Sequence, residues 1–495
     1  MPLGTPRHKT RIVCTIGPAS ESRRVLREML GAGMNVARLN FSHGQPEYHR
    51  ALIDRIREAA ASEGRRIAIL GDLPGPKIRI GDLPREPLLL ERGDTVVLSG
   101  RERDTQGVIP VQFPGLAEAL KRGDRLYLND GFIELEVLAV TGDRVRCRVA
   151  VGGELRSRKG VNFPGIDLGV SAFTEEDHAW LRFAAAQGLD AVSQSFVSRA
   201  EDVRAVREAA RALDYDPFII AKIERAGALD HLEPILEAAD GLMVARGDLG
   251  VEIPIERIAV VQKRIMRLAN QAGKPVITAT QMLESMVEHL RPTRAEATDV
   301  ANAILDGTDG VMLSGESAVG AHPVEAVRML ARIAQVTEPH RDDCSLREAL
   351  QEQGRSRKGP VGTVDLLALS IYHIIERVLP VAVFVPTTSG ATARSVTRFR
   401  LPVWIVALSQ QESTCQRLLF SYGVHPVHAA EHAADWTPYI RRWLQVRGIT
   451  RGLVLLMQGP SPAHPCTNQR LELIDLERHL AQCPVDEEPG AETSQ

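Results

Sequence analysis

The chain has 495 residues, of which 44% are hydrophobic and 25% are charged, close to the average for globular proteins. This composition excludes a disordered or fibrous chain, and the length predicts roughly two to four domains. Sixty Lys and Arg residues against 63 Asp and Glu residues leave a net charge of −3. The overall charge therefore predicts neither nucleic acid nor a membrane surface as a partner.

The six cysteines are scattered, with no Cys-x-x-Cys pair and no Cys/His spacing of a zinc site, which favours reduced, buried thiols. The N-terminal residues are polar and interrupted by proline, unlike those of a signal peptide. The longest purely apolar run, residues 378–386, is too short to span a bilayer. We therefore expect a soluble, cytoplasmic protein.

Eight short runs rich in Val, Ile and Ala predict parallel strands, at residues 11–17, 35–42, 66–73, 190–197, 218–224, 241–250, 275–282 and 310–317. Amphipathic segments separate them, such as residues 199–213, where Val203, Val206, Ala210 and Leu213 fall on one helical face. Alternating strands and helices in this number predict an α/β fold, a (β/α)8 TIM barrel. An open doubly wound sheet is a structural alternative that periodicity does not exclude.

Gly-Asp turns and alternating strands, such as residues 144–151, interrupt this pattern between the third and fourth strands. They predict a small all-β domain inserted at the top of the barrel, where it could close over a site as a lid. After residue 340 the chain is charged and polar, and then strands and helices resume. We predict helices at 364–378 and 414–422, and strands at 381–385, 403–408 and 453–457.

These patterns divide the chain into five parts. Residues 1–76 and 161–340 form the barrel, residues 77–160 the inserted β lid domain, and residues 341–483 a C-terminal α/β domain. We expect the acidic residues 484–495 to be a disordered tail.

Polar residues cluster where the predicted barrel strands end, which is where a TIM barrel holds its active site. Lys222 and Glu224 are two residues apart, so on a strand both side chains face the barrel interior. A structural ion pair would explain them. However, Asp248 ends the next strand and offers a second carboxylate, which favours a Mg²⁺ site.

Three cations, Arg38, Lys222 and Arg246, end neighbouring strands and suit an anionic substrate. Together with Mg²⁺ they indicate phosphoryl transfer, which depends on positioning and charge neutralisation. The sequence has no phosphate-binding P-loop and no Gly-x-Gly-x-x-Gly after a strand.

A nucleotide would therefore need other contacts. Arg79, Lys159 and His43 are the candidates, although each alone also fits a solvated surface residue.

Several long segments resemble the pyruvate kinase family, over most of the chain from Lys9 to about Pro426. They are residues 10–20, 34–43, 75–79, 159–165, 222–224, 243–254, 278–286, 292–296 and 311–316. The resemblance implies a barrel, a β lid, a C-terminal regulatory domain and a homotetramer. It also implies Mg²⁺-dependent phosphoryl transfer from phosphoenolpyruvate to ADP, giving pyruvate and ATP in the last step of glycolysis.

The resemblance further implies roles for the residues at the strand ends. Glu224 and Asp248 would bind Mg²⁺ or Mn²⁺, and Lys222 and Arg38 would bind the phosphoryl group. Gly247, Asp248 and Thr280 would bind the rest of the substrate, with Thr280 near the enolate carbon that is protonated. The residues that would face ADP are Asn40, His43, Arg79 and Lys159, and those that would support the site are Arg246, Ser314 and Glu316.

One departure from the family concerns potassium. Many members hold K⁺ at the positions of Asn40, Ser42, Asp72 and the Leu73 carbonyl, beside a Glu that is Lys77 here. This combination resembles the potassium-independent branch, and a Lys ammonium would supply the charge of the ion. We therefore predict no K⁺ requirement. The alternative is that Lys77 points to solvent or to the nucleotide.

In the C-terminal domain, a Ser/Thr/Gly loop follows a predicted strand and precedes a helix, a geometry that can hold phosphate. Its residues are Thr387, Thr388, Ser389, Gly390 and Thr392. It resembles the family's effector loop, which suggests a sugar phosphate or AMP as effector, although a simple helix cap would also explain it. Residues 459–465 depart from the family's usual loop and leave the effector open.

Two other functions compete with an active pyruvate kinase. A non-catalytic regulatory homologue that binds phosphometabolites would be expected to lack Lys222, Glu224, Asp248 or Thr280, and all four are present. Another Mg²⁺-dependent barrel enzyme acting on phosphoenolpyruvate or pyruvate would need no inserted β domain.

Overall fold

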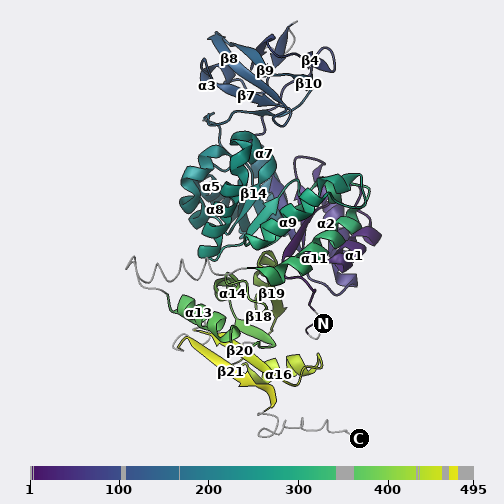
Figure 1. The fold of residues 1–495 in the computed structure, drawn as a ribbon, viewed down its shortest axis with the longest axis vertical. Coiled ribbons are helices and arrows are strands. Elements are labelled where there is room, and N and C mark those ends of the chain that lie inside the picture. Colours follow the sequence, from purple (N-terminus) through teal and green to yellow (C-terminus); the bar gives the residue numbers. More distant parts are fainter. Residues whose placement is uncertain are drawn as a thin grey trace. The chain divides into compact units, whose positions relative to one another are not determined.

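The computed structural model describes residues 3, 5–101, 107–166, 168–341, 362–430, 433, 435–459 and 468–477 (Figure 1). The chain forms two compact units, residues 10–341 and residues 1–9 with 342–495. Within the described residues, no helix is both long and apolar enough to cross a membrane.

Eight parallel strands close into a barrel, which excludes the open sheet. In spatial order they are β1 (Arg11–Thr15), β2 (Val36–Asn40), β3 (Ala68–Leu73), β12 (Ala191–Gln194), β13 (Phe218–Ile223), β14 (Gly241–Ala245), β15 (Val276–Ala279) and β16 (Gly310–Leu313). The register places Asn40 opposite Asp72 and Thr15 opposite Arg38. The ends of β1, β2 and β3 therefore meet at one rim.

Two predicted strands end earlier than expected. The apolar run of β14 stops at the buried Ala245, and the polar residues that follow turn into the short helix α7 (Arg246–Glu252). In the same way, β16 is followed by α10 (Gly315–Ala318). Asp248 therefore lies in the first turn of a helix at the barrel rim and not on a strand.

Helices surround the barrel strands (Figure 1). They are α1 (Arg23–Ala32), α2 (Pro46–Ser62), α4 (Glu175–Ala186), α5 (Ala200–Arg211), α6 (Leu232–Ala238), α8 (Ile258–Gln271), α9 (Arg294–Leu305) and α11 (Pro323–Thr337). Helix α5 buries Val203, Val206 and Ala210, as its periodicity predicts. Leu213 lies beyond its end and is 38% exposed, so its predicted place on the buried face is wrong.

Between β3 and α4 the chain forms an inserted sheet domain, drawn in blue in Figure 1. Its six-stranded sheet has the order β11-β7-β8-β9-β5-β6, beside a two-stranded β10-β4 sheet. The elements are β4 (Leu88–Leu90), β5 (Thr95–Ser99), β6 (Val108–Pro110), α3 (Leu116–Ala119), β7 (Arg125–Leu128), β8 (Ile133–Thr141), β9 (Arg144–Val151), β10 (Gly153–Leu155) and β11 (Val161–Asn162). The domain has its own apolar core, to which the alternating residues Val145, Cys147 and Val149 of β9 contribute.

The second unit contains a five-stranded sheet in the order β19-β18-β17-β20-β21, parallel except for β21. Its elements are α13 (Thr363–Ile375), β17 (Ala382–Pro386), α14 (Ala391–Thr397), β18 (Trp404–Ser409), α15 (Glu412–Arg417), β19 (Val424–His428), α16 (Thr437–Gln445), β20 (Leu453–Gln458) and β21 (Arg470–Asp475). The predicted helix 414–422 begins earlier, at Glu412, and continues as the 3-10 helix Leu418–Phe420. The predicted tail 484–495 and residues 460–465 lie outside the described residues.

Candidate active site

An open cavity lies at the carboxyl ends of the barrel strands. Most residues predicted from the strand ends line it. These are Arg38, Asn40, Ser42, His43, Asp72, Lys77, Arg79, Lys222, Glu224, Asp248, Thr280 and Ser314. Closure of the barrel thus brings together residues that are as much as 276 positions apart in the sequence.

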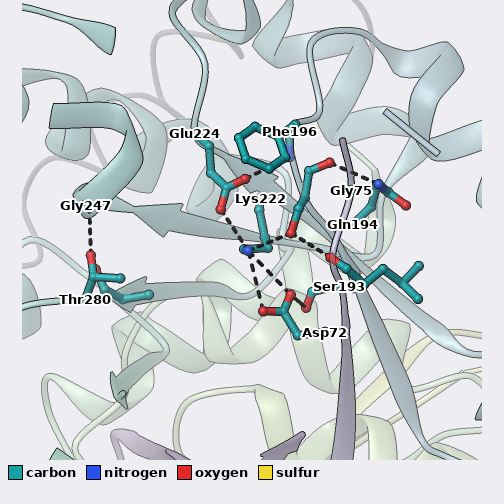
Figure 2. A network of polar contacts seen from close by, with 12 residues as sticks. Asp72, Gly75, Ser193, Gln194, Phe196, Lys222, Glu224, Gly247 and Thr280 are labelled. Carbon is teal, nitrogen blue, oxygen red and sulfur yellow. Dashed lines mark hydrogen bonds and ion pairs between the residues drawn. The ribbon is translucent and has the colours of Figure 1, made fainter. Parts of the chain in front are cut away.

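Lys222 is held between two carboxylates (Figure 2). Its Nζ lies 2.8 Å from Glu224 Oε1 and 3.5 Å from Asp72, and donates to Ser195 Oγ at 2.7 Å. Burial alone lowers the pKa of Lys222, but Asp72 and Glu224 outweigh it and raise the pKa above its ordinary value. The ammonium therefore stays charged at neutral pH, although only 11% of the side chain is exposed.

Asp72 also joins Lys222 to Arg38. The Arg38 Nε donates to Asp72 Oδ2 at 3.0 Å, its Nη2 contacts the same oxygen, and its Nη1 donates to Thr15 Oγ1 at 2.8 Å. Ser193 Oγ donates to the other Asp72 oxygen at 2.6 Å. Burial raises the pKa of Asp72, but the charges of Lys222 and Arg38 outweigh this effect and hold the pKa below its usual range. Asp72 is therefore ionised and orients both cations toward the cavity.

Glu224 and Asp248 are the two carboxylates that could hold a divalent cation. Glu224 is 1% exposed, and its Oε2 accepts a hydrogen bond from the backbone N–H of Phe196 at 2.8 Å. Burial raises the pKa of Glu224, and Asp248 raises it further against the opposing effect of Lys222. A divalent cation would relieve this repulsion between carboxylates.

Asp248 is half-buried and lines the same cavity. Among the described residues, no cluster of three or more His, Cys, Asp or Glu side chains could hold a metal. A cation held by Glu224 and Asp248 would take its other ligands from water and substrate oxygens.

Thr280 and Gly247 face each other across the cavity rim. The Gly247 N–H donates to Thr280 Oγ1 at 2.8 Å, and this hydroxyl donates to the Ala279 carbonyl at 2.6 Å. Thr280 and Gln281 have φ values of 67° and 54°, in the left-handed region that a β-branched residue such as Thr rarely adopts. Such backbone strain of about 1–3 kcal/mol is typical of functional sites.

Arg246 holds the turn that contains Thr280 and Gln281. Its Nη2 donates to the Thr280 carbonyl at 2.8 Å, and its Nη1 lies 2.7 Å from Asp299. Arg246 does not line the cavity, so the expectation of three cations around its mouth is wrong for this residue. Its contacts fit the supporting role that the family resemblance implies.

Ser314 and Glu316 form the second support. Ser314 lines the cavity, and its backbone N–H donates to Glu316 Oε2 at 2.7 Å. Glu316 is fully buried and also accepts from the Leu283 N–H at 3.0 Å. It therefore joins the loops that follow β15 and β16.

Comparison with known proteins matches two stretches of the chain to one family. Residues 7–327 match the family described as "Pyruvate kinase, barrel domain", and residues 365–459 match "Pyruvate kinase, alpha/beta domain". The chain belongs to the pyruvate kinase family.

The relatives include pyruvate kinases from an archaeon and from bacteria. That of Thermococcus litoralis is 45% identical over 85% of this chain and 89% of its own length. That of Geobacillus stearothermophilus is 45% identical over 86% of this chain and 72% of its own length. That of Staphylococcus aureus is 42% identical over 85% and 71%.

Pyruvate kinases are phosphotransferases that act on phosphoenolpyruvate and ADP, giving pyruvate and ATP, and the family implies a requirement for a divalent metal. Neither the regulatory homologue nor another barrel enzyme is favoured.

The residues expected to face ADP lie in two places. Asn40, His43 and Arg79 line the cavity, whereas Lys159 does not. The His43 carbonyl accepts a hydrogen bond from His49 Nε2 at 2.8 Å, which fixes the turn after β2. Lys159 lies on the inserted sheet domain beside Gly160, which pairs with Arg79 as an isolated bridge.

The residues at the position of the family's K⁺ site have protein partners here. Asp72 contacts Arg38, Lys222 and Ser193. Asn40 Oδ1 accepts from the Ser42 N–H at 3.2 Å, and the Leu73 carbonyl accepts from Ser195 Oγ at 2.7 Å. Lys77 is exposed and lines the same cavity, without an ion pair to Asp72 in the described part of the chain.

The Ser/Thr/Gly loop of the C-terminal unit makes the contacts of a helix start. Thr387 Oγ1 accepts from the Gly390 N–H at 3.0 Å, and Ser389 Oγ accepts from the Ala391 N–H at 3.4 Å. The Thr388 carbonyl accepts from Thr414 Oγ1 at 2.7 Å. Gly390 has a φ of 81°, which favours glycine.

The polar residues at the end of β12 were not among those predicted for the site. Ser193, Ser195 and Phe196 contact Asp72, Lys222 and Glu224 respectively. The available signal was the spacing of Ser193 and Ser195, which are two positions apart in a predicted strand, so that both side chains would face the same side.

Proposed function

We propose that this protein is an active pyruvate kinase in which Mg²⁺ is held by Glu224 and Asp248, and that it works in the cytoplasm as a homotetramer. The observation that carries the proposal is Lys222, which is buried beside Glu224 and faces the cavity with Arg38, Asp248 and Thr280. This set of two carboxylates, two buried cations and the Thr280 hydroxyl suits transfer of a phosphoryl group from an enol phosphate.

The donor set fits Mg²⁺ because it consists of oxygen ligands only and leaves room for water and substrate. Mn²⁺ would fit the same ligands. When bound, the metal would neutralise charge on the transferring phosphoryl group. Its positive charge would favour the ionised form of Glu224, whose pKa burial raises.

Lys222 and Arg38 would stabilise the phosphoryl oxygens, since Asp72 binds and orients both cations before the substrate arrives. The Gly247 N–H and the Thr280 hydroxyl would bind the substrate carboxylate. The bond between them shows that they are within 2.8 Å, so one carboxylate could accept from both groups. Thr280 would also lie near the carbon of the enolate that gains a proton.

The nucleotide would lie on the opposite side of the phosphoryl group, against Asn40, His43 and Arg79. Lys159 would join them when the inserted sheet domain closes as a lid. Such closure would exclude water, which would otherwise intercept the phosphoryl group.

We infer that the enzyme needs no K⁺. Asp72 already binds Arg38, Lys222 and Ser193, and Lys77 brings an ammonium to the same cavity. A further monovalent cation there would be repelled by these charges.

We further propose that the loop 387–392 binds a phosphorylated effector, a sugar phosphate or AMP. Two hydroxyls, of Thr387 and Ser389, and a left-handed glycine ahead of a helix support this proposal. Activation of the wild type, but not of a Ser389→Ala/Thr388→Ala variant, would support this site.

The decisive experiment is pyruvate formation from phosphoenolpyruvate, ADP and Mg²⁺ by the purified protein, with KCl or with an organic cation at equal ionic strength. Equal rates would support the kinase without K⁺, and strict dependence on KCl would overturn the potassium claim alone. No pyruvate from folded protein, even with sugar phosphates or AMP added, would favour the regulatory homologue. Loss of activity with a metal chelator, restored by Mg²⁺, would support the metal site.

A further inference from the structure

Two crossings connect the barrel to the inserted sheet domain. The outgoing crossing, residues 74–78, follows β3, and the return crossing, residues 168–174, precedes α4. Any movement of the sheet domain must bend the chain at these crossings, because they are its covalent attachments to the barrel. Side chains that fasten them therefore determine how the domain moves.

Asp177, in the first turn of α4, fastens both crossings. Its Oδ1 accepts from the Gly75 N–H at 2.9 Å, in the outgoing crossing. Its Oδ2 accepts from the Thr174 N–H at 2.8 Å and from Thr174 Oγ1 at 2.7 Å, at the end of the return crossing. Asp177 is fully buried, so these bonds are shielded from water.

The end of β12 ties the same crossings to Lys222 (Figure 2). Ser195 Oγ accepts from Lys222 and donates to the Leu73 carbonyl at 2.7 Å, directly before the outgoing crossing. Gln194 Nε2 donates to the Ala172 carbonyl at 2.6 Å, in the return crossing.

Packing leaves little freedom at Gly75. It has a φ of 64°, and an added Cβ would lie 2.9 Å from the ring of Phe196 and 3.1 Å from Ser195. The outgoing crossing therefore lies directly against the segment that contacts Lys222 and Glu224.

We propose that Asp177 is a positioning residue of the reaction, which clamps both crossings to the barrel so that the sheet domain moves as one body relative to Lys222. Gln194 and Ser195 complete the clamp. The inference rests on the proposed lid function of the sheet domain.

A helix cap alone does not explain Asp177. Among the residues that the structure describes, the corresponding residue of the next barrel helix, Asp202 of α5, accepts only from the start of its own helix, from the N–H groups of Ser198 and Arg199 at 2.8 and 3.0 Å. Asp177 makes the same kind of bond to Thr174 and in addition binds Gly75, 102 positions away. Asp202 is therefore a matched control.

The test uses Asp177→Asn and Asp202→Asn in the full chain. In the Asp177→Asn variant the amide side chain keeps one acceptor oxygen and so satisfies only one crossing. We expect amide hydrogen exchange in residues 74–78 or 168–174 of the ligand-free protein to accelerate about tenfold, as expected for a lost buried hydrogen bond. We also expect KM for ADP to rise about tenfold relative to KM for phosphoenolpyruvate. Asp202→Asn should lower Tm but leave both quantities within twofold of the wild type.

Equal exchange and kinetics in the two variants would overturn the proposal. If Asp177→Asn does not fold, Gln194→Met gives the second test, since it removes the Ala172 bond without touching a cap. Faster exchange in residues 168–174 alone would support the clamp, and unchanged exchange would refute it. Exchange is measured without substrate, so it tests the clamp even if the protein forms no pyruvate.

Discussion

The hydroxyl of Thr280 accepts a 2.8 Å hydrogen bond from the backbone N–H of Gly247, although 33 residues separate them. In the proposed mechanism both groups would donate hydrogen bonds to the substrate carboxylate. Thr280→Val keeps the β-branched shape at φ 67° but removes the hydroxyl. We expect kcat to fall about 100-fold or more, as for a lost transition-state donor, while stability changes by about 1 kcal/mol.

Thr280→Ser is the control, because it keeps the hydroxyl. Steady-state kinetics and urea unfolding of both variants provide the measurement. Full activity in Thr280→Val would show that the hydroxyl only shapes the turn.

Loss of the Lys222 charge should affect both catalysis and stability. Lys222→Gln leaves Glu224 and Asp72 buried without the ammonium, so we expect destabilisation of about 3–5 kcal/mol. We expect kcat to fall by about 1,000-fold or more, since a preorganised cation is lost. Urea unfolding and the pyruvate assay measure the two effects.

Arg328 offers a control, because it pairs with Glu325 at 3.0 Å and the two side chains are 51% and 39% exposed. Arg328→Gln should change stability by about 1 kcal/mol or less and leave kcat unaltered. A Lys222 variant that behaved like this control would contradict the proposed role.

Glu252 should make stability depend on pH. Burial raises its pKa to about 7, although the Ala226 N–H donates to it at 3.3 Å. The folded state therefore binds more protons than the unfolded state between about pH 4.5 and 7, so the free energy of unfolding falls as pH rises through this window. The loss is at most about 3 kcal/mol.

Glu252→Gln removes this titration, and its unfolding free energy should fall less steeply over the same window. Glu233→Gln, at an exposed position, should keep the wild-type slope. Urea unfolding at several pH values measures the slopes. Parallel curves for wild type and Glu252→Gln would rule out this source of pH dependence.

Lys77 should control the response to potassium. In Lys77→Glu, a carboxylate replaces the ammonium at the cavity, so we expect K⁺ to raise kcat/KM at least about tenfold by offsetting the new charge. Lys77→Gln separates loss of the positive charge from gain of a negative one. Initial rates with KCl and with an organic cation are the measurement. A Lys77→Glu variant indifferent to K⁺ would dissociate this residue from the cation site.

Local patterns predicted much of this molecule. The eight barrel strands were visible because parallel strands are covered on both faces and so appear as apolar runs. Lys222 and Glu224 were assigned to one face because strand side chains alternate with a period of two. The short strand β19 was missed, because Pro426 and two histidines break its apolar pattern.

The sequence by itself determined that Lys222 and Glu224 share one face and that strand ends carry carboxylates and cations. Only the tertiary structure decided their partners. Asp72 joins Arg38 and Lys222 across 34 and 150 positions, and Arg246 turns away from the cavity to Asp299. The physical reason is that periodicity specifies the face of each side chain, whereas the partner across a barrel depends on closure and register of distant strands, which no local pattern encodes.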